Sequence, residues 1–177
     1  MKLQDGEQVV KRFIYYYSMP TPLGILYLAG SETGLCRVDF TAKSEKSFLK
    51  SIQSENKTIP IKSSQPFKKI IKQLQEYFSG TRKKFDIPLD LSSGTIFQQR
   101  VWKTLLTIPY GKTESYKSVA GQIKKPKATR AVGNANGKNP IPIIIPCHRV
   151  VSADGGLGGY SAGIHNKKKL LQLEGLN

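Results

Sequence analysis

The chain has 177 residues, of which 38% are hydrophobic and 23% charged, a composition typical of a folded globular protein rather than a disordered or fibrous one. Its 28 Lys and Arg outnumber 12 Asp and Glu, giving a net charge of +16, and no apolar run reaches the ~18 residues that a membrane span needs. With two cysteines, no zinc-finger spacing and no apolar signal region at the start, we expect no disulfide framework, no metal and no cofactor. We also expect a cytoplasmic protein, or a nuclear one in a eukaryote.

The first half of the chain is expected to mix strands and helices. Aromatic and branched residues predict strands over 12–18, 24–29 and 35–40, with a proline-rich hairpin turn at 19–23. Helices are expected at 44–53 and 66–79, and an extended segment at 85–91. The second of these helices has one apolar face, made by Phe67, Ile70, Ile71, Leu74, Tyr77 and Phe78. We place a domain boundary at Ser92-Ser-Gly94, which separates residues 1–92 from residues 93–177.

The second half is expected to be mostly helical. Thr95 and Gln98 predict a capping box that opens a helix over 96–107. Short helices are expected from Ser115 to Ala120 and over 127–135, and this succession is typical of a helix-turn-helix. The last apolar positions predict a final amphipathic helix, at Leu170, Leu171 and Leu173.

Charge is unevenly distributed between the two halves. Residues 93–177 hold 13 Lys and Arg but only three acidic residues, a net of +10. A surface so poor in carboxylates attracts polyanions such as nucleic acid. The alternative is a lysine surface that only keeps the protein in solution.

The segment around Cys147 is the strongest candidate for chemistry. An apolar run ending in Pro146 precedes the cysteine, and His148 and Arg149 follow it. A thiol becomes a strong nucleophile as the thiolate, which a nearby base or cation favours. If the backbone turns here, His148 can reach Cys147 directly or through a water, and Glu174 can hold the imidazole tautomer. The alternative is a buried structural cysteine, the role that we assign to Cys36.

Several short motifs together resemble one family. Pro146-Cys-His-Arg-Val150, preceded by Arg130-Ala-Val-Gly133 and Asn139-Pro-Ile-Pro142 and followed by Tyr160-Ser161, is similar to the signature of O6-alkylguanine-DNA alkyltransferases. Gly111–Tyr116 and the Leu-Glu-Gly of residues 173–175 extend the resemblance over most of residues 95–175. It implies an α+β protein, in which a ribonuclease-H-like α/β domain precedes a mostly helical, winged helix-turn-helix-like domain.

The resemblance also implies a monomer that binds double-stranded DNA and no membrane. The helix-turn-helix would lie in the minor groove and extrude the damaged nucleotide into a pocket beside the cysteine. Arg130 would replace the extruded base in the stack, or in the simpler alternative contact a phosphate. Ala128, Ala131 and Gly133 would allow a close approach of the backbone. The lysines implied to touch phosphates are Lys117, Lys125 and Lys127.

In the chemistry that the resemblance implies, Cys147 loses its proton through a water to His148 and Glu174 and displaces guanine from the alkyl carbon. Tyr116 would hydrogen-bond or protonate guanine N3, and Ser161, beside Tyr160, would support O6. The backbones of Cys147 and Val150 would read the exocyclic amine, and Asn139 would brace the turn that holds the thiol. A thioether has no ready hydrolytic route back to the thiol, so the protein would act once.

Other interpretations remain open at this point. Singly, Tyr116 can be a core aromatic, Ser161 a turn former, Asn139 a helix-end cap and Glu174 a solvated carboxylate. The zinc site that some family members carry has no ligands here, because Cys36 is the only Cys or His of the first half. Two rival functions are a non-reactive DNA binder that flags lesions and a cysteine hydrolase acting on a small ester or amide.

Overall fold

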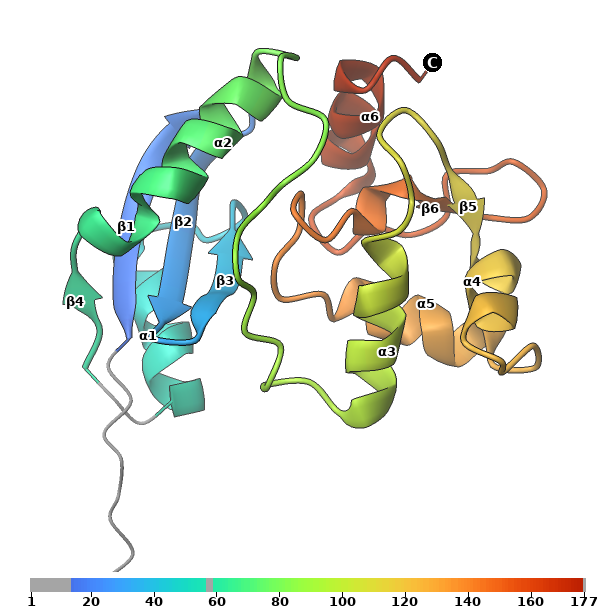
Figure 1. The fold of residues 1–177 in the computed structure, drawn as a ribbon, viewed down its shortest axis with the longest axis horizontal. Helices are drawn as coiled ribbons and strands as arrows, with labels where there is room; N and C mark the ends of the chain where they lie inside the picture. Colours follow the sequence, from blue (N-terminus) through green and yellow to red (C-terminus); the bar gives the residue numbers. More distant parts are fainter. Residues whose placement is uncertain (1–13, 57–58, 177) are drawn as a thin grey trace, which may run out of the picture.

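The computed structural model describes residues 14–56 and 59–176. A four-stranded sheet flanked by two helices forms an N-terminal sheet domain, and a mostly helical domain lies beside it (Figure 1). This arrangement confirms the expected α+β class. Among the described residues, no helix combines the length and the apolar character needed to cross a membrane.

The sheet has the strand order β3-β2-β1-β4. Its strands are β1 (Tyr15–Thr21), β2 (Gly24–Ser31), β3 (Gly34–Asp39) and β4 (Ile61–Lys62). β2 pairs antiparallel with both β1 and β3, and β4 runs parallel to β1 over two residues. Alternate side chains of the central strand β2 enter opposite faces of the sheet, so both faces of this strand are buried.

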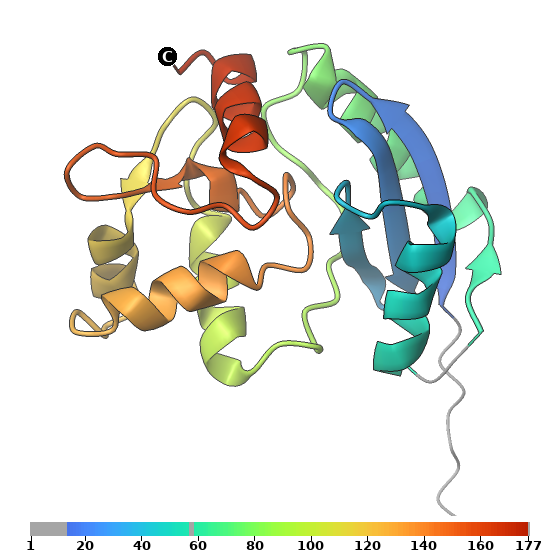
Figure 2. The same cartoon turned by 180° about the vertical axis from the view of Figure 1, so that it is seen from behind.

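One helix covers each face of the sheet, as the two opposite views show (Figures 1 and 2). α1 (Glu45–Asn56) packs Phe48 and Ile52 against Tyr27, whose ring stacks on that of Phe48 at 4.9 Å. α2 (Lys68–Phe78) follows a 3₁₀ turn (Gln65–Phe67) and packs its apolar stripe on the other face. The helices expected at 44–53 and 66–79 are therefore present with shifted ends.

The expected first hairpin is present, but the predicted position of its turn was wrong. β1 continues through Pro20 to Thr21, and the turn is only Pro22-Leu23, not residues 19–23. Pro20 is tolerated because β4 pairs only with the start of β1, so that side of the strand has no partner at Pro20. The Thr21 hydroxyl accepts from Leu23 N–H at 3.2 Å and donates to Gly24 at 2.7 Å, which closes the turn. Residues 12–13 of the expected strand lie outside the described residues.

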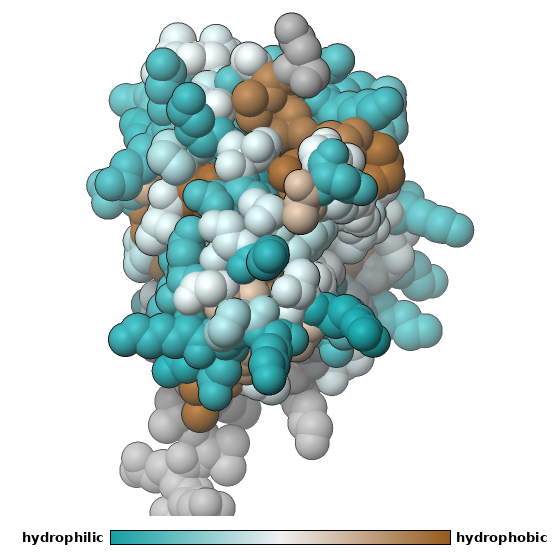
Figure 3. All heavy atoms as spheres, turned by 90° about the vertical axis from the view of Figure 1, so that its right-hand side faces the viewer, coloured by the Kyte–Doolittle hydropathy of each residue, from teal (hydrophilic) through white to brown (hydrophobic). Residues whose placement is uncertain are grey.

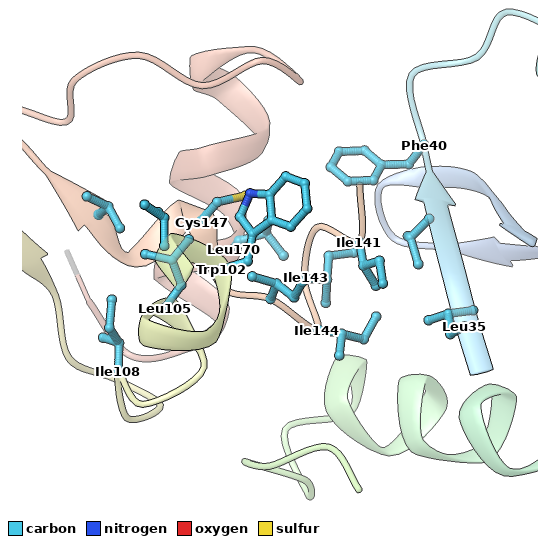
Figure 4. Close-up of a cluster of buried hydrophobic side chains, with 14 of the residues drawn as sticks. Leu35, Phe40, Trp102, Leu105, Ile108, Ile141, Ile143, Ile144, Cys147 and Leu170 are labelled. Atoms are coloured by element: carbon cyan, nitrogen blue, oxygen red, sulfur yellow. The ribbon is translucent and has the colours of Figure 1, made fainter. Parts of the chain in front are cut away.

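The open edge of β3 is covered by two segments that come later in the chain. Leu35 pairs with the extended segment expected at 85–91, through Leu35 N–H to Pro88 O at 3.0 Å and Asp90 N–H to Leu35 O at 2.8 Å. Further along the strand, Val38 N–H donates to Pro140 O at 2.9 Å. Side chains of segment 141–144 then lie between β3 and the core of the helical domain (Figure 4).

The helical domain begins with the capping box that the sequence predicted. Thr95 Oγ1 accepts from Gln98 N–H, and the Gln98 side chain accepts from Thr95 N–H. The helices are α3 (Ile96–Leu105), α4 (Tyr116–Gln122), α5 (Thr129–Gly137) and α6 (Ile164–Leu173). A two-residue parallel pair joins β5 (Glu114–Ser115) to β6 (Val150–Val151). Trp102 of α3 anchors α5 by donating its indole N–H to Ala135 O at 2.8 Å.

Candidate active site

Cys147 lies at the start of a buried 3₁₀ turn, Cys147–Arg149, and only 2% of it is exposed. Asn139 holds the segment before it, since its Nδ2 donates to Ile145 O at 2.8 Å and its Oδ1 accepts from Ile141 N–H at 2.9 Å. Ile143, in the middle of this segment, has a φ of 77°, which is unfavourable for a β-branched residue. The Asn139 side chain and the buried isoleucines thus fix a strained backbone that delivers the thiol.

Glu174, directly after α6, is the centre of a buried hydrogen-bond network. Its Oε1 accepts from Tyr77 Oη at 2.7 Å, from His148 Nε2 at 2.8 Å and from Arg149 Nη2 at 2.9 Å. Its Oε2 accepts from Arg149 Nε at 2.8 Å and from Gly111 N–H at 3.2 Å. A carboxylate that accepts this many donors can stay ionised although it is buried.

The network fixes the protonation states around His148. Burial alone would raise the pKa of Glu174, but the hydrogen bonds from His148 and Arg149 outweigh it and lower that pKa to about 2. Burial lowers the pKa of His148, against the attraction of Glu174. At neutral pH the imidazole is therefore neutral and carries its proton on Nε2, where the carboxylate accepts it. Nδ1 has no partner among the described residues and keeps its lone pair for a proton.

The polar groups nearest the thiol favour the thiolate, whereas burial opposes it. Burial raises the pKa of Cys147, and the nearby polar groups of Asn139 and Tyr160 and the charge of Lys167 lower it in part. Burial and the negative charge of Cys147 raise the pKa of Tyr160, so its hydroxyl stays protonated. The resting cysteine is thus a thiol, and it needs a base to become a nucleophile.

Lys167 of α6 is fully buried, which is rare for a lysine. Its ammonium donates to Val150 O at 2.5 Å and to Leu157 O, and so ties the turn after Cys147 to the loop that precedes Tyr160. Burial lowers the pKa of Lys167 to about 8, and a thiolate at Cys147 would act in the opposite direction. A cation therefore lies on the cysteine's side of the site without a carboxylate partner among the described residues.

Tyr116, the first residue of α4, lies between α5 and the glycine-rich part (residues 155–159) of the loop that connects β6 to α6. Its hydroxyl donates to Gly159 O at 3.3 Å, and its ring is 3.9 Å from where a Cβ on Gly133 would be. A Cβ on Gly158 would come within 3.0 Å of the same ring. Burial and the charge of Cys147 raise the pKa of Tyr116, which keeps its hydroxyl a donor at neutral pH.

The residues expected to contact DNA lie together on the helix-turn-helix. Ala128 precedes α5, and Arg130 and Ala131 are exposed in its first turn. Lys117, Lys125 and Lys127 are exposed on α4 and on the turn that follows it. Figure 3 views the side of the molecule on which α4 and α5 lie, and hydrophilic side chains project from its lower part. The surface thus combines cations with small residues that permit close approach of a partner.

The residue expected to contact guanine O6 is exposed, whereas the carbonyls expected to contact the exocyclic amine belong to buried residues. Ser161 is exposed, in the loop that connects β6 to α6. The Val150 carbonyl accepts from Lys167, and the Cys147 carbonyl accepts from Asn136 Nδ2 at 3.3 Å. The Cys147 carbonyl also accepts from the Val150 backbone N–H, so both of its lone pairs already have a donor. The described residues contain no group of three or more His, Cys, Asp or Glu arranged to hold a metal ion.

Sequence reasoning missed four polar residues of the site: Tyr77, Asn136, Arg149 and Lys167. Lys167 belongs to a run of three lysines, which is usually a solvated face. Its spacing from Leu170, Leu171 and Glu174 (i, i+3, i+4, i+7) was nevertheless a signal that it lies on the buried face of α6. Tyr77 was predicted only as part of the apolar face of α2, and no local pattern connects it to a carboxylate 97 residues later.

Two family models match the chain. The 6-O-methylguanine DNA methyltransferase, ribonuclease-like domain, matches residues 14–91, and the 6-O-methylguanine DNA methyltransferase, DNA binding domain, matches residues 96–176. Among curated relatives, the methylated-DNA–protein-cysteine methyltransferase of Methanosarcina barkeri is 45% identical over 161 residues, covering 91% of this chain and 97% of that protein. The protein of the same name from Mycobacterium tuberculosis is 47% identical over 161 residues, covering 91% and 92%.

Solved structures agree with these matches. The crystal structure of M. tuberculosis O6-methylguanine methyltransferase superposes with a TM-score of 0.80 at 45% identity, covering 92% of this chain and 93% of that one. M. tuberculosis OGT in complex with DNA gives a TM-score of 0.78 at 46% identity, covering 90% and 92%. The expected fold, a ribonuclease-like domain followed by a helical DNA-binding domain, is thereby confirmed.

Proposed function

Because the chain belongs to the 6-O-methylguanine DNA methyltransferase family, we propose that Cys147 is its alkyl acceptor and that His148 and Glu174 generate the thiolate. The protein is a methylated-DNA–protein-cysteine methyltransferase, which repairs DNA by direct reversal. The observation that carries the assignment of residues is the buried Cys147 turn beside a neutral His148 whose Nε2–H is held by Glu174.

The reaction is a displacement at the alkyl carbon. His148 Nδ1 takes the thiol proton of Cys147 through a water, and the sulfur then forms a bond to the alkyl carbon. The bond between that carbon and guanine O6 breaks, and its electron pair stays on the guanine. Tyr116, whose hydroxyl is a donor at neutral pH, hydrogen-bonds to N3 or protonates it as charge develops there, and Ser161 supports O6. The thioether that remains on Cys147 makes the protein a single-turnover reagent.

DNA is bound by the helix-turn-helix, in our proposal from the minor groove of a duplex. The cationic residues of the turn, Lys125 and Lys127, neutralise phosphates on either side of the lesion. Arg130, exposed near the start of α5, enters the stack as the damaged nucleotide leaves it. The small side chains of Ala128 and Ala131 let the helix approach the duplex. We further propose that the protein acts as a monomer, with residues 1–92 and 93–177 as its two domains, and in the cytoplasm.

Intact-protein mass spectrometry tests the assignment directly. The protein is incubated with a short duplex containing one O6-methylguanine, beside Cys147→Ala and, as the matched control, Cys36→Ala. We expect one added methyl group per molecule in the wild type and in Cys36→Ala, and none in Cys147→Ala. Methylation that persists in Cys147→Ala would refute the assignment. Tight, salt-dependent binding without any mass gain would instead indicate a lesion-flagging protein.

A further inference from the structure

We propose that Tyr77, in the N-terminal sheet domain, is a positioning residue for alkyl transfer, because its hydroxyl holds the Glu174 carboxylate against His148. The inference rests on the proposed function, since it concerns the base that deprotonates Cys147. With Tyr77, the hydrogen-bond network around Glu174 reaches beyond the helical domain, which contains the other side chains of that network.

The hydrogen bond that carries the inference is short and buried. Tyr77 Oη donates to Glu174 Oε1 at 2.7 Å, and the same oxygen accepts from His148 Nε2 at 2.8 Å. Tyr77 is fully buried and Glu174 nearly so. One carboxylate oxygen thus joins a helix of the sheet domain to the imidazole of His148.

The surroundings of Tyr77 show that the hydroxyl has one specific partner. Its ring packs edge-on against Phe78 at 5.5 Å and Tyr110 at 6.1 Å, and tilted against Phe85 at 5.4 Å. A phenylalanine would fill this aromatic cluster equally well, and a buried hydroxyl without a partner is costly. The hydroxyl is therefore explained by Glu174 rather than by packing.

The position of the bond on Oε1 determines what it does to His148. Arg149 holds both oxygens of Glu174, Oε2 through its Nε and Oε1 through its Nη2, so Tyr77 adds a further donor to the oxygen that faces His148. A hydroxyl donor on Oε1 keeps that oxygen aimed at Nε2 and disperses part of its negative charge. Without the hydroxyl, the oxygen attracts an imidazolium more strongly, so the pKa of His148 rises and the neutral base is present only at higher pH.

The charged groups around His148 also shift its pKa, independently of Tyr77. Glu174 raises the pKa of His148, and Arg149 and Lys167 lower it. None of these residues is altered by replacing Tyr77 with phenylalanine. Any shift in the His148 titration can therefore be assigned to the lost hydroxyl.

The test compares Tyr77→Phe with Tyr110→Phe. Tyr110 belongs to the same aromatic cluster, but its hydroxyl donates to the backbone oxygen of Leu173 at 2.7 Å and not to the carboxylate. The chain has only two histidines, and His165 is exposed, so NMR resolves the His148 titration without DNA. The second measurement is the single-turnover rate of methyl transfer from an O6-methylguanine duplex between pH 5.5 and 8.5.

We expect Tyr77→Phe to raise the pKa of His148, to move the acid limb of the rate profile to higher pH by the same amount, and so to slow transfer on that limb by about tenfold, the upper range for one hydrogen bond. Tyr110→Phe should leave the titration and the profile at their wild-type positions. A wild-type His148 titration in Tyr77→Phe overturns the proposal, as does an unchanged rate profile or an equal change in Tyr110→Phe. A wild type that accepts no methyl would contradict the proposed function instead, and the titration would still decide the role of Tyr77.

Discussion

Replacing Glu174 with glutamine should remove a large part of the stability of this protein at neutral pH. Glu174 accepts five hydrogen bonds and is 4% exposed, and two of those bonds neutralise the buried guanidinium of Arg149. Breaking a buried ion pair by removing one partner costs about 3–5 kcal/mol. We expect the free energy of unfolding of Glu174→Gln to fall by this amount at pH 7.

The pH dependence of the free energy of unfolding gives a second value for the stabilisation by Glu174. The pKa of Glu174 is about 2 in the folded protein against 4.5 for an ordinary glutamate. Because the folded value is depressed, the carboxylate contributes its full stabilisation above pH 4.5 and loses it as the pH falls toward 2. The difference corresponds to about 3 kcal/mol, of which about 1.4 kcal/mol should be lost by pH 3.5.

Urea unfolding of wild type and Glu174→Gln at pH 7, 5, 4 and 3.5 measures both quantities. The gap between the two proteins should be constant from pH 7 to 5 and shrink below pH 4.5. Asp86→Asn is the control, since Asp86 forms an ion pair with Lys69 in which both side chains are largely exposed, and its loss should leave stability almost unchanged. A gap near zero at pH 7, or one that does not narrow in acid, would refute the reasoning.

Three further residues, Lys167, Gly94 and Arg130, also give testable predictions. Lys167→Met removes a buried cation and two hydrogen bonds around the thiol, so methyl transfer measured in single turnover should slow by about tenfold or more. In the wild type the rate should also fall above pH 8, where Lys167 loses its charge, and an equal alkaline decline in Lys167→Met would contradict this. Gly94→Ala places a Cβ 2.2 Å from the Trp102 ring, so thermal unfolding should show a loss of about 1–3 kcal/mol, whereas Gly121→Ala, with open space around it, should cost nothing. Arg130→Ala should weaken duplex binding roughly tenfold or more in a fluorescence titration while free O6-methylguanine still alkylates Cys147, and unchanged duplex affinity would count against Arg130 as a DNA contact.

Local patterns predicted much of this fold because they report local physics. The Thr95–Gln98 capping box involves residues three apart, and both of its hydrogen bonds are present. The apolar stripe of α2 likewise follows from helical periodicity alone. The hairpin turn was misplaced because Pro20 reads as a turn former, whereas its tolerance inside β1 depends on the short reach of β4.

The site was predictable to the same extent. Cys147, His148 and Glu174 were predicted from their motif and its companions, and the structure brings the last two into contact. Arg149 stands inside the same motif, but only the tertiary structure shows that it neutralises Glu174 rather than a phosphate. Tyr77 donates to a carboxylate 97 residues away in the sequence, and Lys167 donates to a backbone carbonyl. Neither partner can be recognised from the sequence around Tyr77 or Lys167.

The covering of β3 has a consequence for the chain during synthesis. Backbone groups of this edge strand are paired with Pro88, Asp90 and Pro140. Pro140 is synthesised about a hundred residues after the end of β3. Until then, part of the strand presents free N–H and C=O groups, which is the arrangement that recruits other chains into intermolecular sheets. A protein truncated before residue 140 should therefore tend to aggregate, and the segment that carries Asn139 and the thiol protects the sheet as well as serving the chemistry.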